Sequence, residues 1–201
     1  MLRIARIFRN LLLDFRYQKR YIRGTRISRP DLSGINNETP TDPFVLDLLF
    51  RNIRIKKDDI LVDIGCGRGR VINWWLSQGL QNRIIGIEID SEIADNTKKR
   101  LRIHNNVKIV TANAAEFIIN EGSIFYLFNP FDHNLMKQFS KNMKSAFQDD
   151  RHIQIFYYNC VCINVFASDP FWNVEMFDFP KKGFHKAALI TNNQQNYIHP
   201  Y

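Results

Sequence analysis

From residue 59 onward the sequence alternates short apolar runs with amphipathic stretches, and this alternation limits the possible folds more than any other feature. The apolar runs, expected as strands, occupy residues 60–64, 83–89, 107–111, 123–128 and 153–158. Helices are expected between them over residues 71–78, 91–104, 114–120 and 134–147, with a short one after residue 158. Strands joined by helical crossovers build a parallel sheet with helices on both faces.

Two further strands are expected near the C-terminus, over residues 174–179 and 186–191, with a turn at residues 180–183. So short a connection cannot make a crossover, and it therefore joins antiparallel neighbours. The sequence predicts an α/β fold of Rossmann-like type. It would have a mostly parallel seven-stranded sheet, helices on both faces and one antiparallel strand near the C-terminus.

The first forty residues form a different kind of segment. A helix is expected over residues 2–22, and its apolar side chains share one face, namely Ile4, Phe8, Leu11, Leu12 and Phe15. Residues 24–43 have loop composition, after which Asp42 and Pro43 are typical of a helix start. We therefore divide the chain into a basic N-terminal helical arm and loop, residues 1–40, and a domain over residues 41–201.

The net charge of +8 is confined to the first thirty residues of this arm. Residues 1–30 contain nine of the 28 basic side chains and one of the 20 acidic ones, so the other 171 residues are neutral overall. We expect the arm to contact an acidic partner, RNA or a membrane surface on the substrate side, and not the cofactor.

Several classes of protein are excluded by composition. The mean hydropathy is −0.30, and the longest uncharged stretch, residues 152–168, contains polar side chains that a membrane-spanning helix would not tolerate. Three cysteines cannot build a disulfide framework, and with scattered histidines they give no metal-ligand spacing. We expect a cytoplasmic protein without a metal, with peripheral membrane contact through the arm as an option.

The first strand ends in a glycine loop, Asp63-Ile64-Gly65-Cys66-Gly67-Arg68-Gly69. Open α/β sheets bind ligands at this edge, and glycines let the backbone approach them closely. The dinucleotide fingerprint G-x-G-x-x-G/A needs a small residue where Arg70 stands, and the phosphate-loop pattern is absent. An oxidoreductase is therefore disfavoured.

The segment resembles the first motif of the class I S-adenosylmethionine-dependent methyltransferases, D/E-x-G-x-G-x-G, and Asp63, Gly65, Gly67 and Gly69 complete it. The resemblance implies S-adenosylmethionine as cofactor, held by Asp63 and the loop. Cys66 lies inside the loop, where a small apolar filler is the simpler interpretation than a nucleophile.

The next two strands extend the resemblance. The second ends at Glu88 and Ile89, where the family has an acid for the ribose hydroxyls; Asp90 is better explained as part of the following helix start. After the third strand come Asn113 and Ala114, where the family often has Asp-Ala facing the adenine. Asn113 could accept from the adenine amino group or cap the next helix, and both interpretations stay open.

The fourth strand leads into Asn129, Pro130 and Phe131, similar to but shorter than the N-P-P-aromatic signature of enzymes that methylate amino or amide nitrogens. The resemblance implies that Asn129 accepts from the methyl acceptor and that Phe131 stacks on it; a strand-end turn is the alternative. Tyr158, at the end of the fifth strand, is a further candidate for orienting the substrate.

These observations favour a methyltransferase acting on an unidentified acceptor, with nitrogen as the expected atom and protein amine, small molecule or RNA as the class. The alternative is a non-catalytic membrane- or nucleic-acid-associated binding module on the same fold.

Overall fold

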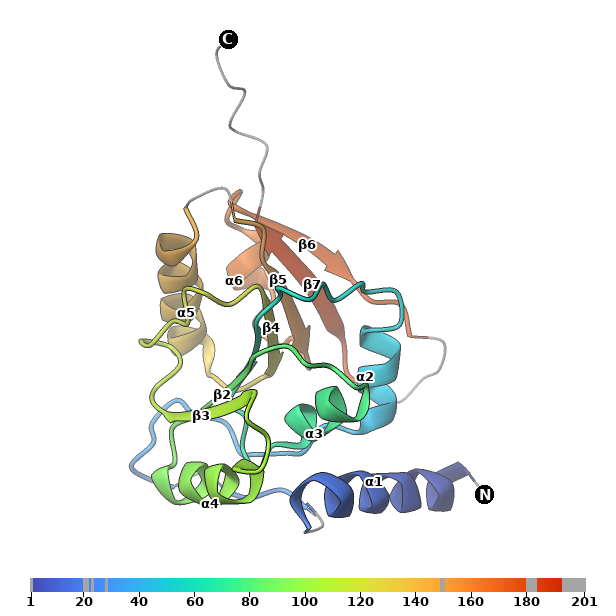
Figure 1. Ribbon diagram of the computed structural model, residues 1–201. Helices are drawn as coiled ribbons and strands as arrows, with labels where there is room; N and C mark the ends of the chain where they lie inside the picture. Colours follow the sequence, from blue (N-terminus) through green and yellow to red (C-terminus); the bar gives the residue numbers. More distant parts are fainter. Residues whose placement is uncertain are drawn as a thin grey trace.

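The computed structural model describes residues 2–19, 22, 24–27, 29–148, 151–179 and 184–192 (Figure 1). One seven-stranded sheet has the order β3-β2-β1-β4-β5-β7-β6. Its strands are β1 (Leu61–Ile64), β2 (Ile84–Glu88), β3 (Val107–Thr111), β4 (Ile124–Phe128), β5 (Gln154–Tyr158), β6 (Trp172–Met176) and β7 (Ala187–Asn192).

The topology confirms the predicted fold class. Strands β1 to β5 pair in parallel, while β7 runs antiparallel to both of its neighbours, β5 and β6. Strand β6 begins two residues earlier than predicted because Trp172 is drawn into the core, where its indole N–H donates to Ser140 at 3.0 Å. The turn predicted over residues 180–183 lies outside the described residues.

Helices cover both faces of the sheet, as Figure 1 shows. They are α1 (Leu2–Gln18), α2 (Pro43–Leu49), α3 (Arg70–Ser77), α4 (Ser91–Leu101), α5 (His133–Ala146) and α6 (Asn164–Ala167). One core layer packs α5 and α6 against the sheet, and the other packs α2, α3 and α4. The start of α2 is as predicted, since Asp42 accepts from the Phe44 N–H at 3.0 Å and Pro43 is the first helical residue.

The helix predicted over residues 114–120 is wrong. Residues 114–116 form a turn, closed by hydrogen bonds from the Glu116 and Phe117 N–H groups to the Asn113 carbonyl. A helix would need the Ala115 carbonyl to accept from residue 119. Here that carbonyl accepts from the Asn142 side chain of α5 at 2.8 Å, so a tertiary contact replaces the helical one.

A buried ion pair joins α1 to the body. Asp14 is fully buried, and its carboxylate lies 2.8 Å from the Arg70 guanidinium on the first turn of α3. The same carboxylate accepts from the Ile22 N–H at 2.9 Å and from Asn73 at 3.3 Å. Burial raises the pKa of Asp14, and Arg70 opposes that rise. The arm is thus attached to the body, while the division at residue 40 stays a prediction.

No helix in the described part of the chain is both long enough and apolar enough to cross a bilayer.

We expect Arg70→Met to lower the free energy of unfolding by about 3–5 kcal/mol, because it leaves the Asp14 carboxylate buried without its cation. Urea unfolding at neutral pH measures this. The matched control is the double variant Asp14→Leu with Arg70→Met, which removes both charges and should recover part of the loss. A single variant as stable as the parent would mean that the pair does not hold α1 in place.

Candidate functional site

The glycine loop between β1 and α3 is built on a left-handed backbone. The φ angles are +71° at Gly65, +50° at Gly67 and +81° at Gly69, which caps α3. At Gly67 space is limiting as well, because an added Cβ would lie 2.6 Å from the Cγ of Glu38. A side chain at Gly67 would therefore meet both backbone strain and a steric clash.

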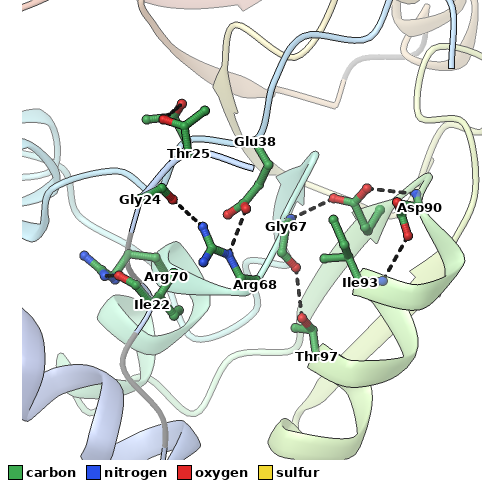
Figure 2. Close-up of polar contacts among 12 residues, drawn as sticks. Ile22, Gly24, Thr25, Glu38, Gly67, Arg68, Arg70, Asp90, Ile93 and Thr97 are labelled. Carbon is green, nitrogen blue, oxygen red and sulfur yellow. Dashed lines mark hydrogen bonds and ion pairs between the residues drawn. The ribbon is translucent and has the colours of Figure 1, made fainter. Parts of the chain in front are cut away.

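Glu88 holds this loop in place from the end of β2. One of its carboxylate oxygens accepts from the Gly67 N–H and the other from the Asp90 N–H, both at 2.9 Å. The Gly67 carbonyl accepts from the Thr97 hydroxyl of α4 at 2.9 Å, so both backbone polar groups of Gly67 are engaged (Figure 2). Burial raises the pKa of Glu88, and the two N–H donors oppose that rise.

Asp90 belongs to the helix start, as predicted. Its carboxylate accepts from the Ile93 N–H at 3.1 Å and caps α4. This leaves Glu88 as the acid of β2 that both holds the loop and lines the cavity beside it.

A cavity opens at the carboxyl edge of the sheet and collects most of the predicted site. The predicted residues that line it are Asp63, Gly65, Cys66, Glu88, Ile89, Asn113, Ala114, Pro130 and Phe131. Gly67 and Gly69 shape the loop and are not among the described lining residues, and neither are Asn129 and Tyr158. Concave sites with a few convergent polar groups are where small ligands bind.

One side of this cavity is lined by a segment that the sequence did not predict to be there. Residues 24–41, which we call the strap, contribute Arg26, Ile27, Leu32 and residues 35–41 to the lining. Its Glu38 pairs with Arg68 of the glycine loop at 2.8 Å, as Figure 2 shows. Its Thr41 hydroxyl lies 2.9 Å from that of Tyr126. Arm residues thus lie at the cavity, against the expectation that the arm stays away from this side; they are Arg26, Ile27, Leu32 and residues 35–40.

Asp63 is the least satisfied polar group of the cavity. Its side chain is 2% exposed, and its Oδ2 atom has no hydrogen-bond partner among the described residues. Burial raises the pKa of Asp63 well above the ordinary carboxyl range, and the neighbouring Glu88 carboxylate adds to this rise. A buried carboxylate without a partner is costly, so this group favours a cationic ligand.

The charges around the cavity agree with that preference. Four acidic residues line it, namely Glu38, Asp63, Glu88 and Asp90. Of the basic lining residues, Arg70 pairs with Asp14, and Arg26 pairs with Glu92 at 3.1 Å. A pyrophosphate would meet repulsion here, whereas a ligand with a sulfonium and an ammonium group would be attracted.

Asn113 makes the local contact that a cap would make. Its side-chain oxygen accepts from the Ala115 N–H at 3.0 Å, although what it caps is a turn and not a helix. The contact of Asn113 with adenine stays a prediction.

Cys66 has the environment of an apolar filler. It is 6% exposed, and a Cβ added at Gly86 would lie 2.7 Å from its sulfur, so the thiol fills the space above that glycine of β2. Burial raises the pKa of the Cys66 thiol well above its usual range, which disfavours the nucleophilic thiolate.

The loop after β4 is organised by its neighbours. Asn129 has a φ of +42°, and its side-chain oxygen accepts from the Tyr157 hydroxyl at 2.9 Å. The side-chain amide of Asn36, from the strap, donates to the carbonyls of Asn129 at 2.8 Å and Phe131 at 3.0 Å. The Asn36 backbone N–H donates to the Pro130 carbonyl at 2.9 Å.

Two of the expected acceptor-side roles need correction. Phe131 is only 3% exposed and packs on Phe139 of α5, which leaves little of its ring free to stack on a substrate. Tyr158 packs on the opposite face of the sheet, against Phe128 with ring centroids 4.8 Å apart. Successive strand residues point to opposite faces, and it is therefore Tyr157 that reaches Asn129.

The comparisons with known proteins agree with this geometry. Residues 61–149 match the model of the methyltransferase domain family. A stretch of 74 residues, 37% of this chain, is 30% identical to 43% of the probable cobalt-precorrin-6B C(15)-methyltransferase (decarboxylating) of Archaeoglobus fulgidus. The chain thus spans less than half the length of this curated relative.

Solved structures share the fold over most of the chain. A methyltransferase from Pyrococcus furiosus superimposes with a TM-score of 0.59 at 18% identity, covering 95% of this chain and 98% of that one. An RNA methyltransferase from Salinibacter ruber, in complex with S-adenosyl-L-homocysteine, superimposes with a TM-score of 0.56 at 17% identity. The match covers 80% of this chain and 97% of that one.

Residues 61–149 thus match a methyltransferase domain, and the glycine motif and the fold resemble those of the class I S-adenosylmethionine-dependent methyltransferases. S-adenosylmethionine is the cofactor of this class, and the cavity fits it. Asp63 offers an unpaired buried oxygen to a cationic group, and Glu88 retains acceptor capacity for ribose hydroxyls. Among the described residues no three His, Cys, Asp or Glu side chains are grouped as a metal ion would require.

We expect cofactor affinity to rise with pH through the raised pKa of Asp63, because the cationic cofactor binds the carboxylate and not the neutral acid. Calorimetric titration with S-adenosylmethionine, in two buffers of different ionisation enthalpy, should show proton release on binding. Asp63→Asn should weaken binding by about 1.5–3 kcal/mol and flatten the pH dependence. An unaltered pH profile in Asp63→Asn would show that another group titrates.

In the unliganded protein, the contribution of Asp63 to stability should change with pH in the opposite direction to cofactor affinity. The folded state holds the Asp63 proton more tightly than the unfolded state, so the contribution of Asp63 to stability is greatest at acidic pH. It falls as pH rises from the ordinary carboxyl range to the raised pKa. Asp63→Asn should reduce this fall, as thermal unfolding across that range would measure. An equal fall in both proteins would contradict the expectation.

Proposed function

We propose that this protein transfers the methyl group of S-adenosylmethionine to a nitrogen atom of its acceptor. The choice of nitrogen rests on the loop after β4, because its backbone carbonyl groups accept hydrogen bonds from N–H donors. Three successive carbonyls, those of Asn129, Pro130 and Phe131, accept from the N–H groups of Asn36. The resemblance noted above gives this loop the role of accepting from a target nitrogen.

The cofactor supplies a methyl group that is already activated for in-line displacement. The contribution of the protein is therefore alignment and charge, as in other reactions that depend on positioning. Asp63 and Glu88 bind the cofactor from β1 and β2, and the β4 loop orients the acceptor. A neutral nitrogen brings its own lone pair, so no general base is needed before the transfer.

Tyr157 acts on this loop as a positioning residue. Its hydroxyl donates to the Asn129 side-chain oxygen and accepts from the Cys162 N–H at 3.3 Å. Burial raises the pKa of Tyr157, so the hydroxyl keeps its proton at neutral pH and remains a donor. The Asn129 oxygen has a second lone pair, which is available to a donor on the acceptor.

In this proposal an entering acceptor replaces the side-chain amide of Asn36. That amide is itself an N–H donor of the kind that the proposal assigns to the acceptor. Asn36 is exposed, so the exchange does not require the core to open.

The acceptor atom can be identified directly. Fractions of a lysate are incubated with the protein and S-adenosylmethionine carrying a ¹³C-labelled methyl group, and the labelled product is examined by nuclear magnetic resonance. We expect the carbon shift of a methyl on nitrogen. A methyl on oxygen or carbon would overturn the choice of nitrogen but not the cofactor. The absence of S-adenosylmethionine binding, beside NAD as control, would overturn both.

We further expect Asn129→Gly to reduce turnover on the acceptor identified in this way by roughly ten- to a thousandfold. Cofactor affinity should stay unchanged, because alignment of the acceptor acts in the transition state. Glycine tolerates the positive φ at this position, so the variant tests the side chain alone. Asn129→Asp should retain part of the activity, since a carboxylate also accepts.

Tyr157→Phe is the matched control for positioning. It removes one hydrogen bond and keeps the ring, so kcat should fall less than in Asn129→Gly. Wild-type turnover in Asn129→Gly would make Asn129 a turn residue with no role toward the acceptor.

A further inference from the structure

Helix α1 is amphipathic, and it turns its apolar face to the solvent. The exposed fractions are 74% for Ile4, 62% for Phe8, 57% for Leu12 and 53% for Phe15, with Ile7 beside them at 45%. These residues recur at helical spacing and form one row along the helix. We call Ile4, Phe8, Leu12 and Phe15 the apolar row. A helix of a globular protein ordinarily turns such a row toward the core.

The contacts of α1 with the body explain this orientation. The face that meets α3 and α4 carries Asp14, which binds Arg70, and Tyr17, whose ring lies 5.8 Å from that of His104. Arg9 adds a hydrogen bond to Asp47 of α2 at 2.9 Å. Rotating α1 to bury the apolar row would break the buried ion pair, so the outward orientation is fixed by polar contacts.

The charge of the arm indicates what covers the row. Residues 1–30 hold nine basic side chains and one acidic one, while the rest of the chain is neutral. Arg16 and Lys19 are exposed at the C-terminal end of α1. An apolar row on a basic helix, followed by further basic residues, is the pattern of segments that lie in the interface of an anionic bilayer.

We propose that α1 docks the protein onto an anionic lipid surface, with the apolar row inserted among the acyl chains. A second copy of the chain fits less well, because pairing these faces would bring together two copies of residues 1–30, each of net charge +8. A nucleic acid also fits less well, since its phosphates would use the basic side chains but leave the apolar row in water.

Docking would also set the position of the active cavity. The strap follows α1 in the chain and lines the cavity, so a helix held at the bilayer holds the cavity entrance near it. The inference about lipid rests on α1 alone and is independent of the acceptor atom.

The test uses the full chain and vesicles of phosphatidylcholine, with or without phosphatidylglycerol. We expect sedimentation with the anionic vesicles only, weakened by added salt. Phe8→Ser with Leu12→Ser should reduce this binding at least tenfold. Both positions are exposed, so the variant should keep the parent's melting temperature and cofactor affinity.

Two further measurements make the result decisive. The matched control is Ile103→Ser with Val161→Ser, two exposed apolar residues outside the arm, which should bind vesicles as the parent does. Phe8→Trp serves as a reporter, because the native tryptophans are buried and a blue shift with anionic vesicles would come from α1.

Three results would overturn the proposal. One is the absence of binding to anionic vesicles. Another is binding that Phe8→Ser with Leu12→Ser leaves unchanged, which would mean attraction by charge without insertion. The third is a lipid-free dimer, seen by sedimentation velocity, that the same double variant dissociates, since the row would then belong to a second copy.

Discussion

The buried ion pair between Asp14 and Arg70 decides how the first forty residues relate to the rest of the molecule. Arg70 directly follows the last glycine of the loop, so the helix that begins there is tied at once to the loop and to α1. Taking two charges out of water is costly, and their partners must be well placed. Asp14 meets this condition through Arg70, Asn73 and the Ile22 N–H. From this anchor the chain passes into the strap that lines the cavity.

A second constraint is the accumulation of carboxylates at the carboxyl edge of the sheet. Glu88 is accommodated because two backbone N–H groups donate to it, and in return it fixes the glycine loop. Asp63 has no such donor on its Oδ2 atom in the described structure, and Glu88 makes its ionisation harder. The edge therefore favours a cationic ligand, such as one that carries sulfonium and ammonium groups.

Much of this architecture could be predicted from the sequence because the signals are local. Strands β1 to β5 have apolar runs, the glycines mark a loop, and Asp42 and Asp90 are recognisable caps. The failures have tertiary causes. Asn142 takes the Ala115 carbonyl that a helix would need, and strand alternation assigns the contact with Asn129 to Tyr157 instead of Tyr158. From the sequence alone, Arg70 could only be used to exclude the dinucleotide pattern. Its ion-pair partner, Asp14, could not be identified because it lies 56 positions away in the chain.

The strap was missed for a different reason. It has no periodicity, and a segment without periodicity gives no signal about what it touches. Yet its contacts with two different loops come from residues separated by a single position. Asn36 binds the loop after β4, and Glu38 binds Arg68 of the glycine loop. The backbone between them is short and is held at Glu38 by a bridge to Arg26. We therefore expect a displacement of Asn36 to reach Glu38 and the glycine loop that Glu38 contacts. In this structure the strap thus joins the loop after β4 to the glycine loop.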